Sequence, residues 1–326
     1  MSPRVSVVMA THNRAQLVGR AIASVRGQSL VDWEMICVDD GSTDETAAVI
    51  QAIGEPRVHL IRLPTNRGAS HARNVGIDAA RADYVAFLDD DNEWAPAMLE
   101  ALLARAADPD GAPPGVVYCL AYRENDATGR FAPPWRLMPR GDVFRRLLEG
   151  WNPWLSCVIV RRPALTAAGA FDESLPAFED YDLFLRLAAN GVRFVGVSRP
   201  LLIRHEHHGR GAASGDPVRL RRGLEGLDRK WREAILGRTG RATYRRWRAR
   251  LHAGVEFVAV RNAVGRGQRW SAWRRVAAMG QYLPWSIHFP ALAAVLVLLG
   301  PTGYDRLARL RDAVLRYGRD ERARRA

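Results

Sequence analysis

Short apolar runs rich in β-branched residues alternate with amphipathic helical segments through about the first 215 residues of this 326-residue chain. Strand-like runs cover 4–10, 33–38, 57–63 and 84–88, and between them apolar residues recur at helical spacing. Because each helix then connects two neighbouring strands, this order is typical of an α/β fold with a doubly wound, mostly parallel (mixed) sheet. Further strands are predicted at 115–122, 154–160 and 192–197, with a helix at 181–190.

The balance of charge changes along the chain. The formal net charge is +13, yet residues 1–200 carry 21 basic and 25 acidic residues, whereas 201–326 carry 27 and 10. We therefore expect two parts, an α/β domain at 1–215 and a basic helical region at 216–326. The basic part is suited to anionic lipid, nucleic acid or a phosphorylated substrate.

Two segments of the basic region favour a membrane surface over nucleic acid. The segment 282–304 has an apolar core at 291–299 that is only ~14 Å long as a helix, against a hydrocarbon layer of ~30 Å. An interfacial or re-entrant segment is therefore favoured over a full span. The tail at 305–325 has the pattern of a basic amphipathic helix, which can lie on anionic lipid or pack on its own domain.

The expected compartment is the cytoplasm, with the protein peripheral on the inner face of the cell membrane. Cys37, Cys119 and Cys157 each lie inside an apolar run, which predicts buried thiols in a reducing environment. The segment "MSPRVSVVMATHNR" has no long apolar stretch, so no secretory signal is expected.

Polar side chains follow three of the predicted strands. The first strand is followed by 11–14 (Thr-His-Asn-Arg), the second by 39–42 (Asp-Asp-Gly-Ser), and the fourth by 89–91 (three aspartates). In doubly wound sheets, ligands bind at the carboxyl ends of the strands. One such segment alone would predict a turn, but three together predict a shared cleft.

Three adjacent carboxylates require a counter-charge, which arginines or a divalent cation could supply. A hard cation such as Mg²⁺ or Mn²⁺ prefers oxygen ligands and commonly shares its coordination shell with substrate phosphates. This favours a nucleotide diphosphate as the ligand. The sequence has neither a GxxxxGK[ST] loop nor a GxGxxG motif after the first strand, so it does not resemble P-loop NTPases or dinucleotide-dependent dehydrogenases.

Four segments of the chain together resemble the successive motifs of family 2 glycosyltransferases with the GT-A fold. They are "VSVVMATHNRAQLVGRAIASVRGQ", "ICVDDGSTDET", "NRGASHARNVGIDAARADYVAFLDDDN" and "FEDYDLFLRLAANG". The resemblance covers about residues 4–205, in the order and spacing of the family. It implies an inverting transferase that uses a nucleotide-sugar donor and a divalent metal, Mn²⁺ or Mg²⁺.

The resemblance also implies roles for individual residues. The first turn would lie by the base and ribose, Asp40 would bond the base, and Gly68, Arg73 and Asn74 would line the nucleotide-sugar cleft. Asp91 would be the main metal ligand, with Asp89 and Asp90 at ribose or metal-bound water. The implied nucleotide-sugar residues are Thr11, His12, Asn13, Arg14, Asp40, Gly68, Arg73, Asn74, Asp89 and Asp90, and the implied metal ligands are Asp91 and Asp89.

The catalytic base would be Asp180, although a carboxylate at a helix start is also a common cap. Glu179 is an alternative base or an acceptor contact. Among 205–208, His205 or His207 would touch metal or diphosphate, or else lie in solvent. Arg210 would bind diphosphate from a mobile lid or belong to an ordinary linker. Trp151 is the preferred acceptor-stacking residue, with Trp135 a further candidate, whereas Trp154 is expected in the core.

The sequence therefore predicts transfer of a sugar, most simply from a UDP-sugar, to a hydroxyl of a cell-envelope glycan or lipid-linked acceptor. The Q-x-x-R-W signature of processive synthases is missing, which favours single additions. One alternative is a nucleotidyltransferase of related fold, although the Gly-rich loop of that class is absent after the first strand. The other is a nucleic-acid-binding protein acting through the basic region, which the apolar run at 291–299 disfavours.

Overall fold

The computed structural model describes residues 2–107, 113–125, 129–131, 138–205, 215–282, 291 and 293–300. Its contacts divide the chain into two compact units. The first comprises Met1–Leu147, Trp151–Glu173 and Glu179–His208, and the second comprises Leu148–Gly150, Ser174–Phe178 and Gly209–Ala326. The functional boundary expected near residue 215 stays a prediction.

One mixed sheet of nine strands, counted over the described residues, forms the frame of the first unit. Its order is β3-β2-β1-β4-β8-β6-β9-β5, with β7 paired to β6. The first four strands are parallel, β6 and β9 are also parallel, and the other pairs are antiparallel. The predicted α/β fold is therefore confirmed. The strands are β1 (Val5–Thr11), β2 (Trp33–Asp39), β3 (Val58–Arg62), β4 (Tyr84–Phe87), β5 (Asn92–Trp94), β6 (Val116–Asn125), β7 (Gly129–Phe131), β8 (Val158–Arg161) and β9 (Phe194–His205).

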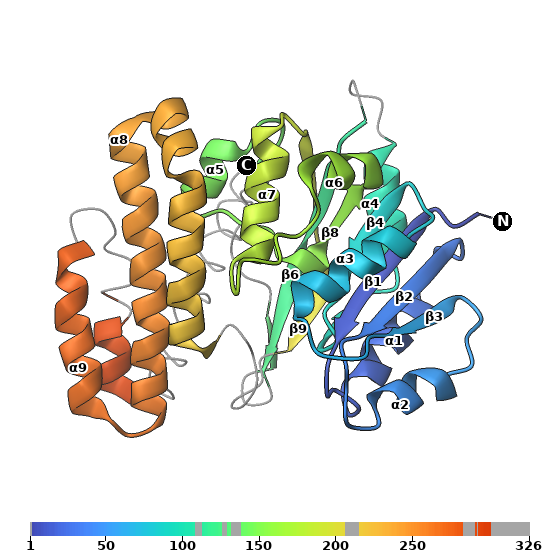
Figure 1. The fold of residues 1–326 in the computed structure, drawn as a ribbon, viewed down its shortest axis with the longest axis horizontal. Helices are drawn as coiled ribbons and strands as arrows, with labels where there is room; N and C mark the ends of the chain where they lie inside the picture. The colour runs from blue at the N-terminus through green and yellow to red at the C-terminus, as the bar shows by residue number, and fades with distance from the viewer. Residues whose placement is uncertain are drawn as a thin grey trace, which may run out of the picture. The chain divides into compact units, whose positions relative to one another are not determined.

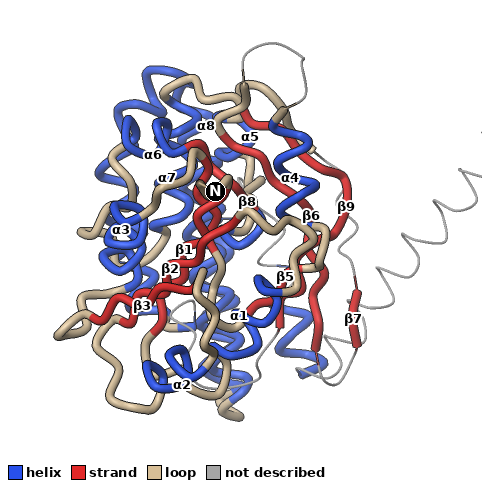
Figure 2. The backbone as a smooth tube through the Cα atoms, turned by 90° about the vertical axis from the view of Figure 1, so that its right-hand side faces the viewer, coloured by secondary structure: helices blue, strands red, loops and turns tan. Residues whose placement is uncertain are grey.

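Helices bury both faces of this sheet, which explains why its central strands are apolar throughout rather than alternating. Val7 of β1 belongs to the core cluster formed with α1 (Val18–Arg26), α2 (Thr46–Ala52) and α4 (Met98–Ala106). The neighbouring Val8 points the other way, toward α3 (Ala69–Ala79), where a Cβ added at Gly76 would lie 2.4 Å from its Cγ1 atom. Figure 2 shows α3, α6 (Arg162–Ala168) and α7 (Glu179–Ala189) on one side of the strands and α4 on the other.

One predicted strand is only partly correct. Within 154–160 the chain first forms a 3₁₀ turn, Leu155–Cys157, and only then enters β8. The turn is held because the Trp94 indole N–H donates to the Ser156 carbonyl over 2.8 Å. This tertiary contact directs the Ser156 backbone away from a strand ladder. The segment between β7 and this turn carries the short helix α5 (Phe144–Leu148).

The second unit is built mainly from α8 (Pro217–Gly265) and α9 (Arg269–Ala278). Asp216 caps α8 by accepting a hydrogen bond from the Val218 N–H over 2.9 Å. Gly240 has a non-helical φ of 81° and divides α8 into two halves, which run side by side in Figure 1. The two halves are antiparallel, because residues at increasing distance before and after Gly240 pair with one another: Asp228 with Arg248, and Arg221 with Glu256.

The apolar run near the C-terminus is partly packed in the second unit. Ala293, Leu296 and Val297 are buried against α8 and α9, whereas Leu298 and Leu299 are exposed. No helix in the part of the chain that the structure describes is long and apolar enough to cross a membrane. The interfacial placement of 282–304 stays a prediction, since much of that segment, like the tail at 305–325, lies outside the described residues.

Candidate functional site

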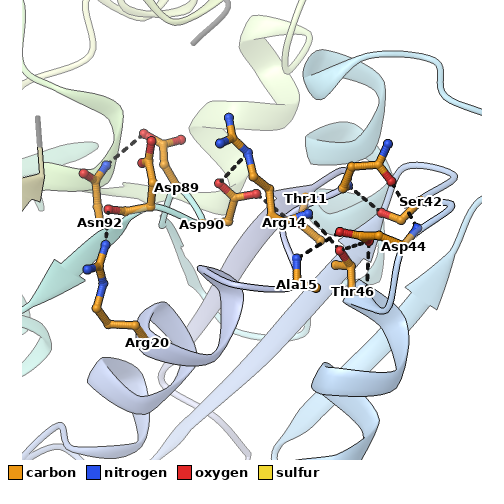
Figure 3. Close-up of polar contacts among 12 residues, drawn as sticks. Thr11, Arg14, Ala15, Arg20, Ser42, Asp44, Thr46, Asp89, Asp90 and Asn92 are labelled. Atoms are coloured by element: carbon orange, nitrogen blue, oxygen red, sulfur yellow. Dashed lines mark hydrogen bonds and ion pairs between the residues drawn. The ribbon is translucent and has the colours of Figure 1, made fainter. Parts of the chain in front are cut away.

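The polar ends of β1 and β4 meet at the carboxyl edge of the sheet. The Thr11 hydroxyl donates to Oδ2 of Asp90 over 2.7 Å, and Nε of Arg14 lies 3.9 Å from Oδ1 of the same carboxylate (Figure 3). These contacts follow from the sheet order, because β1 lies between β2 and β4. The structure therefore brings the residues after the first and fourth strands together.

Asp40, which follows β2, holds the loop that leads into α3. Its two carboxylate oxygens accept the backbone N–H groups of Arg67 and Gly68, each over 2.8 Å. Gly68 has a φ of 96°, a conformation that favours glycine, and it caps the start of α3. The Asp40 carbonyl is 2.9 Å from Nδ1 of His12. The buried Asp40 side chain thus positions the turns around the predicted nucleotide cleft, and its contact with a base stays a prediction.

The turn after β1 is fastened to the loop after β2. Asn13 has a φ of 53°, and its backbone N–H donates to the Ser42 hydroxyl over 2.9 Å. The Asn13 side-chain oxygen accepts the backbone N–H of Thr43 over 2.8 Å. The Arg14 N–H donates to the Thr46 hydroxyl over 2.8 Å. The predicted base-and-ribose turn is therefore a rigid structure rather than a loose loop.

Three side chains hold the carboxylate of Asp89. Nη2 of Arg73 donates to Oδ1 over 3.0 Å, and the Ser156 hydroxyl donates to Oδ2 over 2.9 Å. Asn92 also reaches Oδ2 over 3.3 Å, and the Asp89 N–H donates back to the Ser156 oxygen over 3.0 Å. Arginine therefore supplies part of the counter-charge of the aspartate cluster.

Asp91 and His205 are connected through two intermediate residues. Nη2 of Arg20 donates to the Asp91 carbonyl over 3.3 Å, and Nε of Arg20 lies 3.1 Å from Oε1 of Glu93. The same Glu93 oxygen is 2.6 Å from Nε2 of His205, while Nδ1 of His205 is 3.3 Å from Glu124. Both ring nitrogens of His205 therefore face carboxylates, and its role as a metal ligand stays a prediction.

The donor set fits a cation that is shared with substrate. Burial, together with the nearby charges of Asp91 and Asp89, raises the pKa of Asp90 to about 6 against the opposing effects of Thr11 and Arg14. Such mutual repulsion is relieved by a divalent cation. Among the described residues, however, no group of three or more His, Cys, Asp and Glu side chains is arranged to hold a metal by itself. This suits Mg²⁺ or Mn²⁺, which bind one or two carboxylates and complete their shell with diphosphate and water.

The start of α7 brings two further carboxylates to the cluster. Nη1 of Arg73 donates to Glu179 over 3.0 Å, so Arg73 joins this helix to Asp89. Desolvation raises the pKa of the Asp180 carboxyl to about 7, and the Glu179 charge contributes in the same direction. Asp182 serves a different purpose, because its fully buried carboxylate pairs with Nε of Arg186 over 2.8 Å.

Other predicted residues have different surroundings. The Asn74 amide pairs with the backbone of Phe171 through two hydrogen bonds of 2.9 Å, which makes it a support for the segment before α7. The half-buried Trp151 ring packs edge-on against Tyr118, with centroids 5.0 Å apart, and its acceptor role stays a prediction. The partly buried Trp154 packs against the core cluster. Trp135, His207 and Arg210 lie outside the described residues.

Comparison with known proteins identifies the family. Residues 6–168, from β1 to α6, match the profile of glycosyl transferase family 2. WcaA of Escherichia coli (strain K12), a glycosyl transferase named for colanic acid biosynthesis, is 32% identical over 231 residues, 67% of this chain and 78% of its own. The chain belongs to glycosyl transferase family 2.

Other relatives match over a smaller share of their length. The succinoglycan biosynthesis protein ExoU of Rhizobium meliloti is 31% identical over 58% of this chain and 58% of its own. The GalNAc(5)-diNAcBac-PP-undecaprenol beta-1,3-glucosyltransferase of Campylobacter jejuni is 32% identical over 40% of this chain and 42% of its own. The chain thus spans less than two thirds of the length of both.

Solved structures of glycosyltransferases share the fold. TarS of S. aureus in complex with UDP-GlcNAc gives a TM-score of 0.55 at 18% identity, covering 79% of this chain and 83% of that chain. The mannosyltransferase PcManGT of Pyrobaculum calidifontis, in complex with GDP-Man and Mn²⁺, gives 0.55 at 21% identity, covering 91% and 88%. The expected GT-A architecture of the family 2 chain is therefore confirmed.

Two supporting residues of this family 2 site were not predicted from the sequence. Ser156 is fully buried beside Asp89, and Arg20 projects from α1 to the Asp91 carbonyl. A serine inside the apolar run "WLSCVIV" was a usable signal, because a buried hydroxyl needs a partner. Nothing in the sequence marked Arg20 as part of the site, since an arginine on an amphipathic helix is ordinarily a solvated residue.

Proposed function

We propose that this glycosyltransferase moves a sugar from a nucleotide-diphosphate sugar to an acceptor hydroxyl, with inversion at the anomeric carbon. The observation that carries the proposal is the carboxyl group of Asp180, with a pKa raised to about 7, beside a cluster that Arg73 links to Asp89. A general base is most effective when its pKa is close to the working pH. Family membership supplies the reaction class.

Asp180 is a better candidate for the base than Glu179. The Glu179 carboxylate is already engaged by the Arg73 guanidinium over 3.0 Å, so it is less available to an acceptor hydroxyl. In the proposed step, Asp180 accepts the proton of the acceptor hydroxyl while that oxygen attacks the anomeric carbon opposite the departing diphosphate. Arg73 keeps the start of α7 in register with the aspartates after β4.

The proposed donor is a UDP-sugar, bound across the turns after β1 and β2. The relevant residues are 11–14, Asp40, Gly68 and Asp90. The solved relatives bind UDP-GlcNAc in one case and GDP-Man in another, so both bases belong in the test.

Asp91 and Asp89 would hold the divalent metal. Mn²⁺ or Mg²⁺, when bound, neutralises the charge that develops on the leaving diphosphate. Ser156 and Arg73 fix the Asp89 carboxylate, so that its direction is set before the donor arrives. Arg14 and Thr11 hold Asp90 in the same way.

The proposed acceptor is a cell-envelope glycan or a lipid-linked sugar, to which single sugars are added. Support comes from relatives named for colanic acid and succinoglycan biosynthesis and from one whose name specifies an undecaprenol-linked acceptor. Such an acceptor implies a cytoplasmic enzyme that is peripheral on the inner face of the membrane. The basic charge of residues 201–326 agrees with this placement.

A donor screen tests the proposal. The chain is incubated with UDP-, GDP- and dTDP-sugars plus membrane extracts as acceptor, with Mn²⁺, Mg²⁺ or EDTA, and release of nucleoside diphosphate is measured. We expect release with one class of donor, loss with EDTA, and β-configured product from an α-linked donor. If nucleoside diphosphate is released equally well in EDTA, the proposed metal plays no part in the mechanism. If none is released with any donor, the proposed glycosyltransferase activity is contradicted.

A further inference from the structure

A cavity of about 410 Å³ in the second unit is lined mainly by charged and polar side chains and lies outside the sugar-transfer site. Three of its charged residues are arginines and one is a glutamate. Its lining comes from α8, α9 and the turn that follows α9: Arg221, Glu256, Ser271, Arg274, Arg275, Ala278 and Gln281. We name it the arginine cavity.

The cations of the arginine cavity are only partly compensated. Glu256 bonds Arg221 through one carboxylate oxygen and Arg275 through the other, the second over 3.3 Å. Arg274 is exposed and forms no ion pair or hydrogen bond with any residue that the structure describes. Ser271 lies one helical turn before it on the same side of α9. A guanidinium group and a hydroxyl aimed into one cavity match the oxygens of a phosphate group.

Exposed apolar side chains lie next to these cations. Trp270 is 76% exposed and is four residues before Arg274 on α9, so the two are neighbours on the helix surface. Nη2 of Arg269 donates to the carbonyls of Val297 and Leu298, each over 3.2 Å, which brings the start of α9 beside that helical segment. Leu298 and Leu299 are 61% and 49% exposed. An exposed tryptophan with leucines beside arginines is typical of a protein surface that enters a lipid interface.

We propose that the arginine cavity binds the phosphate of an anionic lipid headgroup while Trp270, Leu298 and Leu299 enter the adjoining bilayer interface. The positive charge accounts for the preference for anionic lipid, and the exposed apolar residues favour a lipid over a nucleic acid. This inference deepens the membrane part of the proposed function by naming its contact site. It does not depend on which sugar is transferred.

Vesicle binding by the full chain tests the inference. Co-sedimentation is measured with phosphatidylcholine vesicles that contain or lack phosphatidylglycerol, for the parent, Arg274→Ala, Trp270→Ala and Arg229→Ala. Arg229 is the matched control, because it is an exposed arginine of α8 outside the cavity and its loss changes net charge equally. We expect Arg274→Ala to weaken binding to anionic vesicles about fivefold, which corresponds to ~1 kcal/mol for one basic residue at a membrane. Arg229→Ala should change it less than about twofold.

Several outcomes would overturn the inference. Equal losses in Arg274→Ala and Arg229→Ala would mean diffuse attraction by net charge, and equal binding to both vesicle types would mean that no anionic group is recognised. If inorganic phosphate at constant ionic strength displaces the chain and Trp270→Ala has no effect, the ligand is a free anion. Binding of single-stranded RNA without vesicle binding would assign the cavity to nucleic acid.

The sugar-transfer activity of each variant is measured separately on the same samples. Release of nucleoside diphosphate without vesicles should be unchanged in Arg274→Ala, because the cavity lies outside the donor site. Failure of vesicle binding in an active parent would therefore reject the lipid inference alone. Thermal melting of each variant checks that it folds. We expect Arg274→Ala to melt like the parent, because Arg274 has no hydrogen-bond or ion-pair partner among the described residues.

Discussion

Replacing Asp180 by asparagine should lower activity and raise stability at the same time. Asparagine cannot accept the hydroxyl proton, and loss of a general base costs ~10²–10⁴-fold in kcat. We therefore expect at least a hundredfold loss of nucleoside diphosphate release with donor and acceptor saturating. The parent enzyme should in addition show kcat/KM rising with pH toward a plateau above about 7, as Asp180 deprotonates.

The gain in stability follows from the same raised pKa. The folded-state pKa of Asp180 is about 7 against an ordinary value of 3.8, so the folded chain binds more protons between these values and stability falls as pH rises through them. The full difference corresponds to an upper limit of roughly 4 kcal/mol. Screening by solvent reduces it, and we expect ~1–2 kcal/mol at pH 8. This corresponds to a rise in Tm of roughly 2–8 °C.

Two comparisons make this prediction decisive. The difference in Tm between the parent and Asp180→Asn should be smaller at pH 5 than at pH 8, and it should disappear only below about pH 4, where Asp180 is protonated in the unfolded chain as well as in the folded one. Asp182→Asn, two residues along the same helix, should instead lose about 3 kcal/mol, since it breaks the ion pair that the fully buried Asp182 forms with the partly buried Arg186. Near-normal turnover of Asp180→Asn would refute the base assignment, and an equal Tm difference at both pH values would refute the electrostatic reasoning.

The remaining predictions test the supports of the site and of the sheet. Ser156→Ala should lower kcat about tenfold with little change in fold, because Asp89 loses a charge-assisted hydrogen bond; an unchanged kcat would show that Arg73 and Asn92 are enough to position it. Glu34→Ala should cost about 2 kcal/mol in urea unfolding, because the buried Ser6 hydroxyl at the start of β1 loses the carboxylate that accepts its hydrogen bond; a loss below 1 kcal/mol would contradict this, and turnover of folded enzyme should be unaffected. Gly76→Ala should cost ~1–3 kcal/mol in the same assay through collision with a β1 valine, and a neutral effect would mean that α3 shifts freely.

The polar clusters of the sequence predicted which strand ends come together but not how their side chains are held. The carboxyl ends of β1, β2 and β4 were readable from local patterns, because each apolar run stops where its polar residues begin. The partners of those residues were not readable, since they lie far along the chain. Arg73 and Glu179 are 106 residues apart, and Asp89 and Ser156 are 67 residues apart.

The sequence by itself determined the alternation of strands and helices, the family, and the identity of the acidic residues at the strand ends. Periodicity and motif spacing are local properties, so they survive without coordinates. Only the tertiary structure decided that Arg73 bridges two carboxylates, that burial raises the pKa of Asp180, and that Asn74 supports a backbone segment. Those properties arise from distances and desolvation between distant segments, which the fold alone establishes.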